Sequence, residues 1–235
     1  MTDTGIRVTR EDAVAVVTLA RGDNALDGPG YELLMQTLDE LAKDDGVGAL
    51  VITGEGKFFG NGLHLKWMAA QPPQDRLDFL VNASRLLART AGYEKPIIGA
   101  INGHAFGLGA IWSSGFDFRL MNADKGWVCF PEMDINIPFS PGMIAICEHG
   151  LGRQVFREMA FTATRYTGSE AVAVGWARKA VPADKLVPEA VELAAYMAKK
   201  GSVAFRFTKQ AWAREVVRIL LEEDPKAIRK IPFPM

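Results

Sequence analysis

Several features common in other protein classes are scarce in this sequence. Its two cysteines, Cys129 and Cys147, show no metal-ligand spacing and are too few for a disulfide framework in a chain of 235 residues, which favours a reducing compartment. With 27 basic and 28 acidic residues the formal charge is -1, so bulk charge predicts no nucleic acid and no anionic membrane as partner. No apolar run approaches the ~20 residues of a membrane span, and neither end matches a common sorting signal. We therefore expect a cytoplasmic protein.

Apolar residues, in contrast, make up 49% of the chain, which is enough for a substantial core. Short runs rich in β-branched residues predict strands, and apolar residues at helical spacing predict helices. The predicted strands cover residues 13–20, 49–53, 97–101, 116–121 and 127–130. The predicted helices cover residues 31–42, 77–88, 140–150, 153–162, 169–177, 187–200 and 203–222.

The order of these elements predicts the fold class. Strand and helix alternate up to about Phe130 and helices follow, which is typical of an α/β fold with a parallel core and a C-terminal helical region. We expect residues 1–200 to form the core domain. Residues 201–235 are expected to form a C-terminal helical segment of the same fold, with Gly201 and Ser202 as the joint.

Two glycine-rich loops, residues 59–65 and residues 103–110, share one design. Each follows a buried strand, uses glycine to free backbone N–H groups and enters a helix, so each is able to present donors to an oxyanion. Taken singly, either loop is better explained as a tight strand-to-helix turn. The second loop is not a dinucleotide-binding fingerprint, because Trp112 stands where the third glycine belongs.

Glu132 is the candidate general base. It follows Pro131 at the end of an apolar strand, where loss of solvent would raise the pKa of its carboxyl toward the working range of a base. A solvated surface glutamate is the alternative, and without further context it is the more common case. The three histidines, His64, His104 and His149, show no metal-ligand spacing, so we expect no metal site.

The order of these motifs resembles the enoyl-CoA hydratase/isomerase (crotonase) superfamily over nearly the whole chain. Asn24-Ala25-Leu26 is similar to the Asn-Ala-Leu after the first strand of that family. Residues 56–65 (Gly-Lys-Phe-Phe-Gly-Asn-Gly-Leu-His-Leu) resemble its Gly-x-x-Phe-Ser-Ala-Gly-x-Asp-Leu loop. Residues 95–109, from Lys-Pro to Gly-Leu-Gly, resemble its Lys-Pro-strand-Asn-Gly-x-Ala-x-Gly-Gly-Gly signature. Phe130-Pro131-Glu132, residues 169–182 and residues 202–209 continue the match.

The resemblance implies the roles of individual residues. The backbone N–H groups of Leu63 and Leu108 would form an oxyanion hole and Glu132 would move the proton. Because Leu108 takes the place of a family glycine, it is open whether its backbone keeps the usual angle. His64 replaces the usual Asp, which is expected to alter only the start of the next helix. The implied substrate-binding residues are Ala25, Leu26, Asn61, Gly62, Leu63, His64, Leu65, Gly107, Leu108 and Ile111.

The resemblance also implies an architecture and a ligand. It predicts a β-β-α spiral core whose C-terminal helices pack a homotrimer, often doubled to a hexamer as a dimer of trimers. The CoA thioester would be the substrate, and no separate cofactor is expected. Lys57 is a possible partner for the CoA phosphates, although a solvated loop charge explains this lysine equally well.

The reaction is predicted from one missing carboxylate. Family hydratases hold water with two glutamates, and Ile111 stands at the first of these positions, so only Glu132 remains. One carboxylate suffices to move a proton from C2 to C4 of a 3-enoyl-CoA, which favours a Δ3,Δ2-enoyl-CoA isomerase, with Ile111 and Trp112 expected to exclude water. The alternatives are a hydratase that recruits Asp134 or Glu148 as second acid, and a protein that binds acyl-CoA, or serves an assembly, without catalysis.

Overall fold

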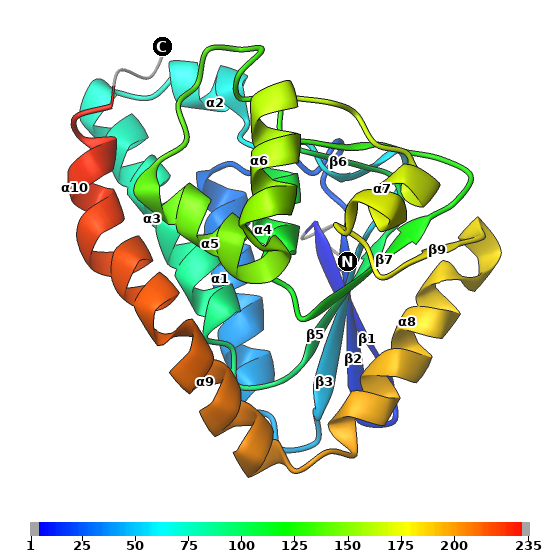
Figure 1. Ribbon diagram of the computed structural model, residues 1–235. Helices are drawn as coiled ribbons and strands as arrows, with labels where there is room; N and C mark the ends of the chain where they lie inside the picture. Colours follow the sequence, from blue (N-terminus) through cyan, green and yellow to red (C-terminus); the bar gives the residue numbers. More distant parts are fainter. Residues whose placement is uncertain (1–4, 232–235) are drawn as a thin grey trace.

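A six-stranded sheet forms the centre of the computed structural model, which describes residues 5–231 (Figure 1). Only the first strand is antiparallel to its neighbour, and all other pairs are parallel. In spatial order the strands are β1 (Ile6–Glu11), β2 (Val14–Leu19), β3 (Ala49–Gly54), β5 (Ile97–Ile101), β7 (Phe118–Asn122) and β9 (Lys179–Val181).

A second, smaller sheet is built from the short strands that follow β3, β5 and β7 along the chain. It contains three short parallel strands in the order β4 (Phe58–Gly60), β6 (His104–Phe106) and β8 (Val128–Cys129). The chain therefore repeats a strand, a short strand in the other sheet and then a helix. This arrangement confirms the predicted α/β fold and explains why the two glycine-rich loops lie together: each leaves one strand of the same small sheet.

Helices cover both faces of the large sheet and form the C-terminal part of the chain (Figure 1). The last helices fold back over α3 and α5. No helix within residues 5–231 is long and apolar enough to cross a membrane. The helices are α1 (Gly28–Lys43), α2 (Leu65–Ala69), α3 (Pro73–Ala91), α4 (Leu108–Ser114), α5 (Pro141–Leu151), α6 (Arg153–Thr162), α7 (Gly168–Val174), α8 (Ala183–Ala198), α9 (Ser202–Arg218), the π-helix η1 (Ile219–Glu223) and α10 (Asp224–Ile228).

The large sheet is buried on both faces, which explains its nearly continuous apolar strands. Successive side chains of a strand point to opposite faces, so Val14 and Val16 pack with Val51 under α8, whereas Val17 and Ile52 pack in the larger core on the other side. The catalytic candidates lie in elements that pack against this larger core.

The sequence patterns missed or misplaced several elements. β1 was not predicted because it is a mostly exposed edge strand of polar residues. β4, β6 and β9 are only three residues long; β4 and β6 overlap the two glycine-rich loops, and β9 lies between two predicted helices. The helix predicted at 187–200 begins four residues earlier and keeps Pro188 inside it. The helix predicted at 203–222 is interrupted, because α9 passes into η1 and then α10.

Arg119 fixes the C-terminal end of α4, the helix that carries Leu108 at its first position. Its guanidinium is buried and donates hydrogen bonds to five backbone carbonyls, those of Ser113, Ser114, Phe116, Gly150 and Trp176. Burial lowers the pKa of Arg119 to about 10, so the side chain remains charged at neutral pH. The last carbonyls of α4 are thereby satisfied by a cation, which the helix dipole also favours.

We predict that Arg119→Met lowers the free energy of unfolding by roughly 3 kcal/mol or more, because it leaves buried carbonyl groups without donors. Urea denaturation of wild type and variant measures this change. The matched control is Arg157→Met, at an exposed arginine, which we expect to stay within about 0.5 kcal/mol of wild type. Equal stability of Arg119→Met and wild type would contradict this role.

Candidate active site

The two glycine-rich turns meet because the strands before them pair with each other. β4 and β6 are parallel neighbours, with Gly60 opposite Ala105. The turn after β6 then approaches the turn after β4 so closely that a Cβ atom on Gly109 would lie 2.3 Å from the carbonyl oxygen of Gly60. Only glycine at position 109 permits this approach.

Two further glycines shape the turns through their backbone angles. Gly62 has a φ of 78°, and Gly107 has a φ of 52° with a ψ of -127°, a combination that side chains disfavour. A Cβ atom on Gly62 would lie 3.4 Å from the backbone nitrogen of Leu108. Leu108 itself is not among the residues with positive φ, so its side chain is accommodated without strain. The special conformation falls on Gly107, one residue earlier.

The amide groups of Leu63 and Leu108 are the donors that this arrangement leaves free. Leu26 forms hydrogen bonds with the residues on both sides of Leu63. The Leu26 N–H donates to the Gly62 carbonyl, and the Leu26 carbonyl accepts from the His64 N–H, each at 2.8 Å. The Leu63 N–H faces the other way. Leu108 opens α4, where an N–H has no partner within its own helix. Across residues 5–231 neither amide has an acceptor, so the pair is suited to bind a negatively charged oxygen.

Glu132 lies beside these turns, after β8. Its side chain is only 4% exposed, and a Cβ atom on Gly107 would lie 3.3 Å from its Oε1. Burial raises the pKa of Glu132 to about 7, against the opposing effect of a hydrogen bond from its own backbone. Among the described side chains, its Oε2 is the one buried nitrogen or oxygen atom with no hydrogen-bond partner. A buried carboxyl group with one unpartnered oxygen and a pKa near neutrality is suited to take and return a proton.

A cavity of about 580 Å³ joins these groups. Most of the predicted residues line it: Ala25, Asn61, Gly62, Leu63, His64, Leu65, Gly107, Leu108 and Glu132. Two do not. Leu26 lines a smaller neighbouring cavity instead, and Ile111 is fully buried in the core behind α4. Trp112 also points away, since its indole N–H donates to the Thr90 hydroxyl at 2.7 Å.

Helix packing adds residues to the cavity wall that the sequence patterns did not single out as site residues. They come mainly from α3, α5, α10 and the turn after Glu132: Leu80, Ala83, Ser84, Leu87, Ile135, Ile137, Ser140, Met143 and Ile228. For the residues that lie in helices, the helical spacing indicates only that they face the interior. A side chain that faces a cavity has the same spacing as one that faces solid core, so periodicity carried no signal for them.

The other acids considered for the site lie elsewhere. Asp134 is exposed, Glu148 forms an ion pair with Arg153 at 3.4 Å, and neither lines the cavity. Asp23 does line it, but this exposed carboxylate already accepts hydrogen bonds from the Asn61 side chain and the Ala25 amide. Glu132 is thus the one buried carboxylate among the cavity-lining residues within the described part of the chain.

His64 begins the helix that follows the first turn, as expected from its place in the motif. Its Nδ1 accepts a hydrogen bond from the Trp67 amide at 3.1 Å, which is the role of an N-cap residue for α2. Lys57 is exposed and does not line the cavity, whereas Lys66 does. Between residues 5 and 231, no group of three or more His, Cys, Asp or Glu side chains is arranged to hold a metal ion.

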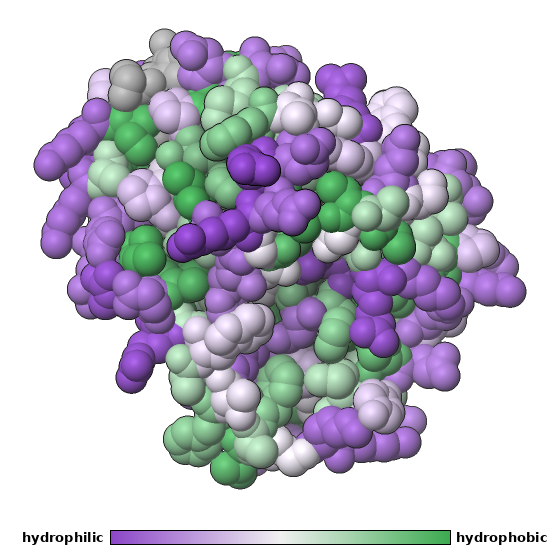
Figure 2. Space-filling model, in the orientation of Figure 1, coloured by the Kyte–Doolittle hydropathy of each residue, from purple (hydrophilic) through white to green (hydrophobic). Residues whose placement is uncertain are grey.

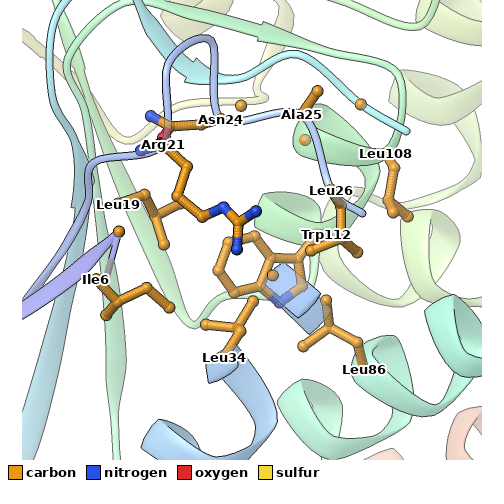
Figure 3. Close-up of a pocket in the computed structure, with 15 residues that line it drawn as sticks. Ile6, Leu19, Arg21, Asn24, Ala25, Leu26, Leu34, Leu86, Leu108 and Trp112 are labelled. Atoms are coloured by element: carbon orange, nitrogen blue, oxygen red, sulfur yellow. Dashed lines mark hydrogen bonds between the residues drawn. The ribbon is translucent and has the colours of Figure 1, made fainter. Parts of the chain in front are cut away.

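A second cavity of about 50 Å³ lies behind the two turns (Figure 3). It shares Ala25, Gly62 and Leu108 with the large cavity, so these residues separate the two spaces. Figure 3 shows the Arg21 side chain extending into this space above Trp112. Arg21 is held there by an ion pair with Asp27 at 2.8 Å. The large cavity, with Glu132 in its wall, is therefore the candidate active site.

Comparison with known proteins places this geometry in a family. The family model described as "Enoyl-CoA hydratase/isomerase" matches residues 9–227. The 2,3-dehydroadipyl-CoA hydratase of Escherichia coli K12 is 30% identical over 87% of this chain and 80% of its own length. Enoyl-CoA delta isomerase 3 of Arabidopsis thaliana is 34% identical over 54% of this chain and 55% of its own length.

Solved structures agree with the sequence relatives. The apo structure of a Mycobacterium tuberculosis enoyl-CoA isomerase superposes with a TM-score of 0.88 at 28% identity, covering 99% of this chain and 100% of that one. Together with the family match over most of the chain, this agreement extends the resemblance from motifs to the whole fold. The chain belongs to the enoyl-CoA hydratase/isomerase family.

Proposed function

We propose that the protein is an enoyl-CoA isomerase that converts a 3-enoyl-CoA to the 2-enoyl-CoA. The observation that carries this proposal is that Glu132, whose Oε2 is unpartnered, is the single buried carboxylate among the described residues that line the cavity. Double-bond migration needs one group that removes a proton and returns it nearby. Addition of water needs a second group to hold and activate the water, and Ile111 stands where the family hydratases have it.

In the proposed reaction, the ionised Glu132 removes a proton from C2, which is acidified by the thioester and by the adjacent double bond. The electron pair moves into a dienolate whose negative charge rests on the thioester oxygen. The protonated Glu132 then delivers the proton to C4, where the electron pair of the C3–C4 double bond forms the new C–H bond. The C2–C3 double bond forms, the thioester carbonyl is restored from the enolate oxygen, and the carboxylate of Glu132 is regenerated. The CoA thioester is the substrate of this reaction. Because no oxidation state changes, the proposal needs no separate cofactor.

The backbone would contribute to catalysis through hydrogen bonds to the dienolate oxygen. The free N–H groups of Leu63 and Leu108 would donate to it, and each such donor contributes roughly 3 kcal/mol to lowering the barrier. Because the amides are fixed by the glycine turns, they need no rearrangement when the charge develops. The same donors would bind the ground-state carbonyl more weakly, since it carries less charge.

The apolar part of the cavity wall is formed by residues other than those expected from the sequence. The prediction placed Ile111 and Trp112 in the cavity wall, but neither side chain lines this cavity. Ile135, Ile137 and Met143 do so instead. An apolar wall disfavours a bound water that would compete with C4 for reaction with the intermediate.

Hydration is the alternative within the family, and it is favoured by the names of most of the similar proteins, which are hydratases. The site supports it less well, because Asp134 and Glu148 lie outside the cavity. Acyl-CoA binding without catalysis is the alternative of another class. Ionisation of a buried carboxyl whose pKa is raised to about 7 lowers the stability of the fold. Binding of acyl-CoA without catalysis does not require such a group.

We predict that Glu132→Gln lowers kcat for 3-enoyl-CoA isomerisation by about 10²- to 10⁴-fold, since the amide does not accept the proton. Steady-state formation of the conjugated product measures this. Glu148→Gln is the matched control and should retain activity, because Glu148 lies outside the cavity. Rapid hydration of 2-enoyl-CoA that Glu132→Gln abolishes would establish the hydratase instead. Absence of either reaction in wild type would support the binding protein.

The raised pKa of Glu132 predicts the pH dependence. Since the base must be ionised, kcat/KM should rise about tenfold per pH unit below pH ~7 and level off above it. The same ionisation lowers the stability of the fold as pH rises through ~7, because the folded-state pKa lies above the unfolded one. Glu132→Gln should therefore be more stable than wild type at pH ~8 by up to about 3 kcal/mol. A flat kcat/KM between pH ~5 and ~9 would contradict Glu132 as base.

We further infer that the protein assembles as a homotrimer, alone or doubled to a dimer of trimers. α9 exposes Val203 and Phe207, at 62% and 61%, and Figure 2 shows hydrophobic side chains at the lower edge, where Figure 1 places the α8–α9 junction. Exposed apolar side chains of this size favour contact with another chain. Sedimentation equilibrium should give three or six times the mass of 25.7 kDa. A monomer at micromolar concentration would contradict this inference.

A further inference from the structure

The side of the large cavity formed by α3, α5 and α10 is apolar. Leu80, Ala83 and Leu87 of α3 line it together with Met143 of α5 and Ile228 of α10. Ile228 is only 3% exposed, so it belongs to the buried part of the cavity wall. Figure 1 shows α10 lying against α3 at this place, which agrees with the contacts between the two helices.

Charged and amide side chains of the lining lie on different elements. Asp23, Asn61 and Lys66 are found on the turn after β2, on the first glycine turn and on α2, and the Asn61 amide donates to Asp23 at 2.8 Å. If the proposed function holds, the thioester lies between these two sides, at Leu63 and Leu108. The hydrated CoA portion then faces the polar residues and the acyl chain faces α3, α5 and α10, because burying the chain among apolar side chains is favourable.

Asp224 holds the three helices of the apolar side together. Its side chain is 1% exposed, its Oδ2 accepts a hydrogen bond from the Ser84 hydroxyl at 2.6 Å, and its Oδ1 accepts from the Gly142 amide at 2.6 Å. Gly142 lies in the first turn of α5, whose dipole favours a carboxylate at that point. One buried side chain of α10 thus joins α3 and α5.

The same contact controls the polarity of the cavity wall. Ser84 lines the cavity, but its hydroxyl is turned to Asp224 and is therefore satisfied away from an acyl chain. Ser140, also in the wall, accepts a hydrogen bond from the Met143 amide. Both hydroxyl groups on this side are engaged, which leaves an essentially apolar surface.

The π-helix η1 affects the direction in which the side chains of Asp224 and Ile228 point around the helix axis. Leu220, Asp224 and Ile228 are spaced by four residues, and in a regular α-helix each such step rotates about 40° beyond a full turn. A π turn holds more residues, so it reverses part of this rotation. All three side chains are buried. π turns inside helices often occur at functional sites.

We infer that Ile228 is the end wall of an acyl-chain site in this cavity and limits the length of chain that the protein accepts, while Asp224 is the residue that positions it. The inference rests on the proposed function, because it takes an acyl thioester as the ligand. Ile228 determines specificity by filling space. Asp224 acts through Ile228, Ser84 and Gly142 without touching the substrate.

The test compares chain-length preference in wild type and Ile228→Ala. Removing the side chain opens the wall, so the ratio of kcat/KM for 3-dodecenoyl-CoA to that for 3-hexenoyl-CoA should rise roughly tenfold. Leu221→Ala is the matched control, since Leu221 is exposed on η1 and does not line the cavity. That variant should keep the wild-type ratio. An unchanged ratio in Ile228→Ala would overturn the end wall.

Asp224→Asn tests the positioning role. We expect a change in KM for the long substrate with kcat for 3-hexenoyl-CoA preserved, because the short chain does not reach the wall. A general loss of kcat for both substrates would indicate a merely structural role and contradict positioning.

Binding of saturated acyl-CoAs separates failure of this inference from failure of the proposed function. Calorimetric titration with hexanoyl-, decanoyl- and tetradecanoyl-CoA needs no chemistry. A preference that shifts to longer chains in Ile228→Ala, in a protein without isomerase activity, would support the wall and refute the reaction. The same preference in both proteins, with isomerase activity intact, would refute the wall alone.

Discussion

The close approach of two backbone turns is the constraint on which the candidate site depends. The parallel pairing of β4 with β6 brings the turns together, and Gly109 against Gly60 leaves no room for a side chain between them. Gly107 then adopts a positive φ, so that α4 begins at Leu108 with its first amide free. At the other end of the same helix Arg119 binds the last carbonyls. α4 is therefore fixed at both ends, and the donor at its start is held in place by backbone geometry.

The second physical feature is the desolvation of Glu132. Burial raises the pKa of its carboxyl to about 7, which makes the group a stronger base than an exposed glutamate and leaves it ionised in part at neutral pH. Within residues 5–231 no cationic side chain contributes to the pKa of Glu132, and its Oε2 has no hydrogen-bond partner, so the ionised form is unfavourable at this point. Such a cost is commonly found at functional sites. In the proposed reaction, the amides of Leu63 and Leu108 would give their greatest stabilisation when negative charge moves from the carboxylate to a bound thioester.

The features of the fold and the site that can be predicted from the sequence are those set by residues close together in the chain. The turns around Gly62 and Gly107, the position of Glu132 and the N-cap role of His64 follow from residue order, and the structure brings them together as expected. Ile111 and Trp112 were misplaced in the cavity wall because the direction of a helical side chain depends on how α4 is seated on the core. β1 was missed because an exposed edge strand carries no hydrophobic pattern. Ser84, Asp224 and Ile228 meet only through tertiary packing, and the π turn between α9 and α10 has no sequence signature that periodicity detects.

The central claim is that a single buried carboxyl carries a proton from C2 to C4 of the acyl chain. Turnover of a 3-enoyl-CoA deuterated at C2, followed by mass spectrometry of the product, tests it most directly. Because Glu132 is 4% exposed, its proton exchanges slowly with solvent, and we predict that a measurable share of the label appears at C4 of the 2-enoyl-CoA. A product with no deuterium at C4, or a 3-hydroxyacyl-CoA as the main product, would contradict the account.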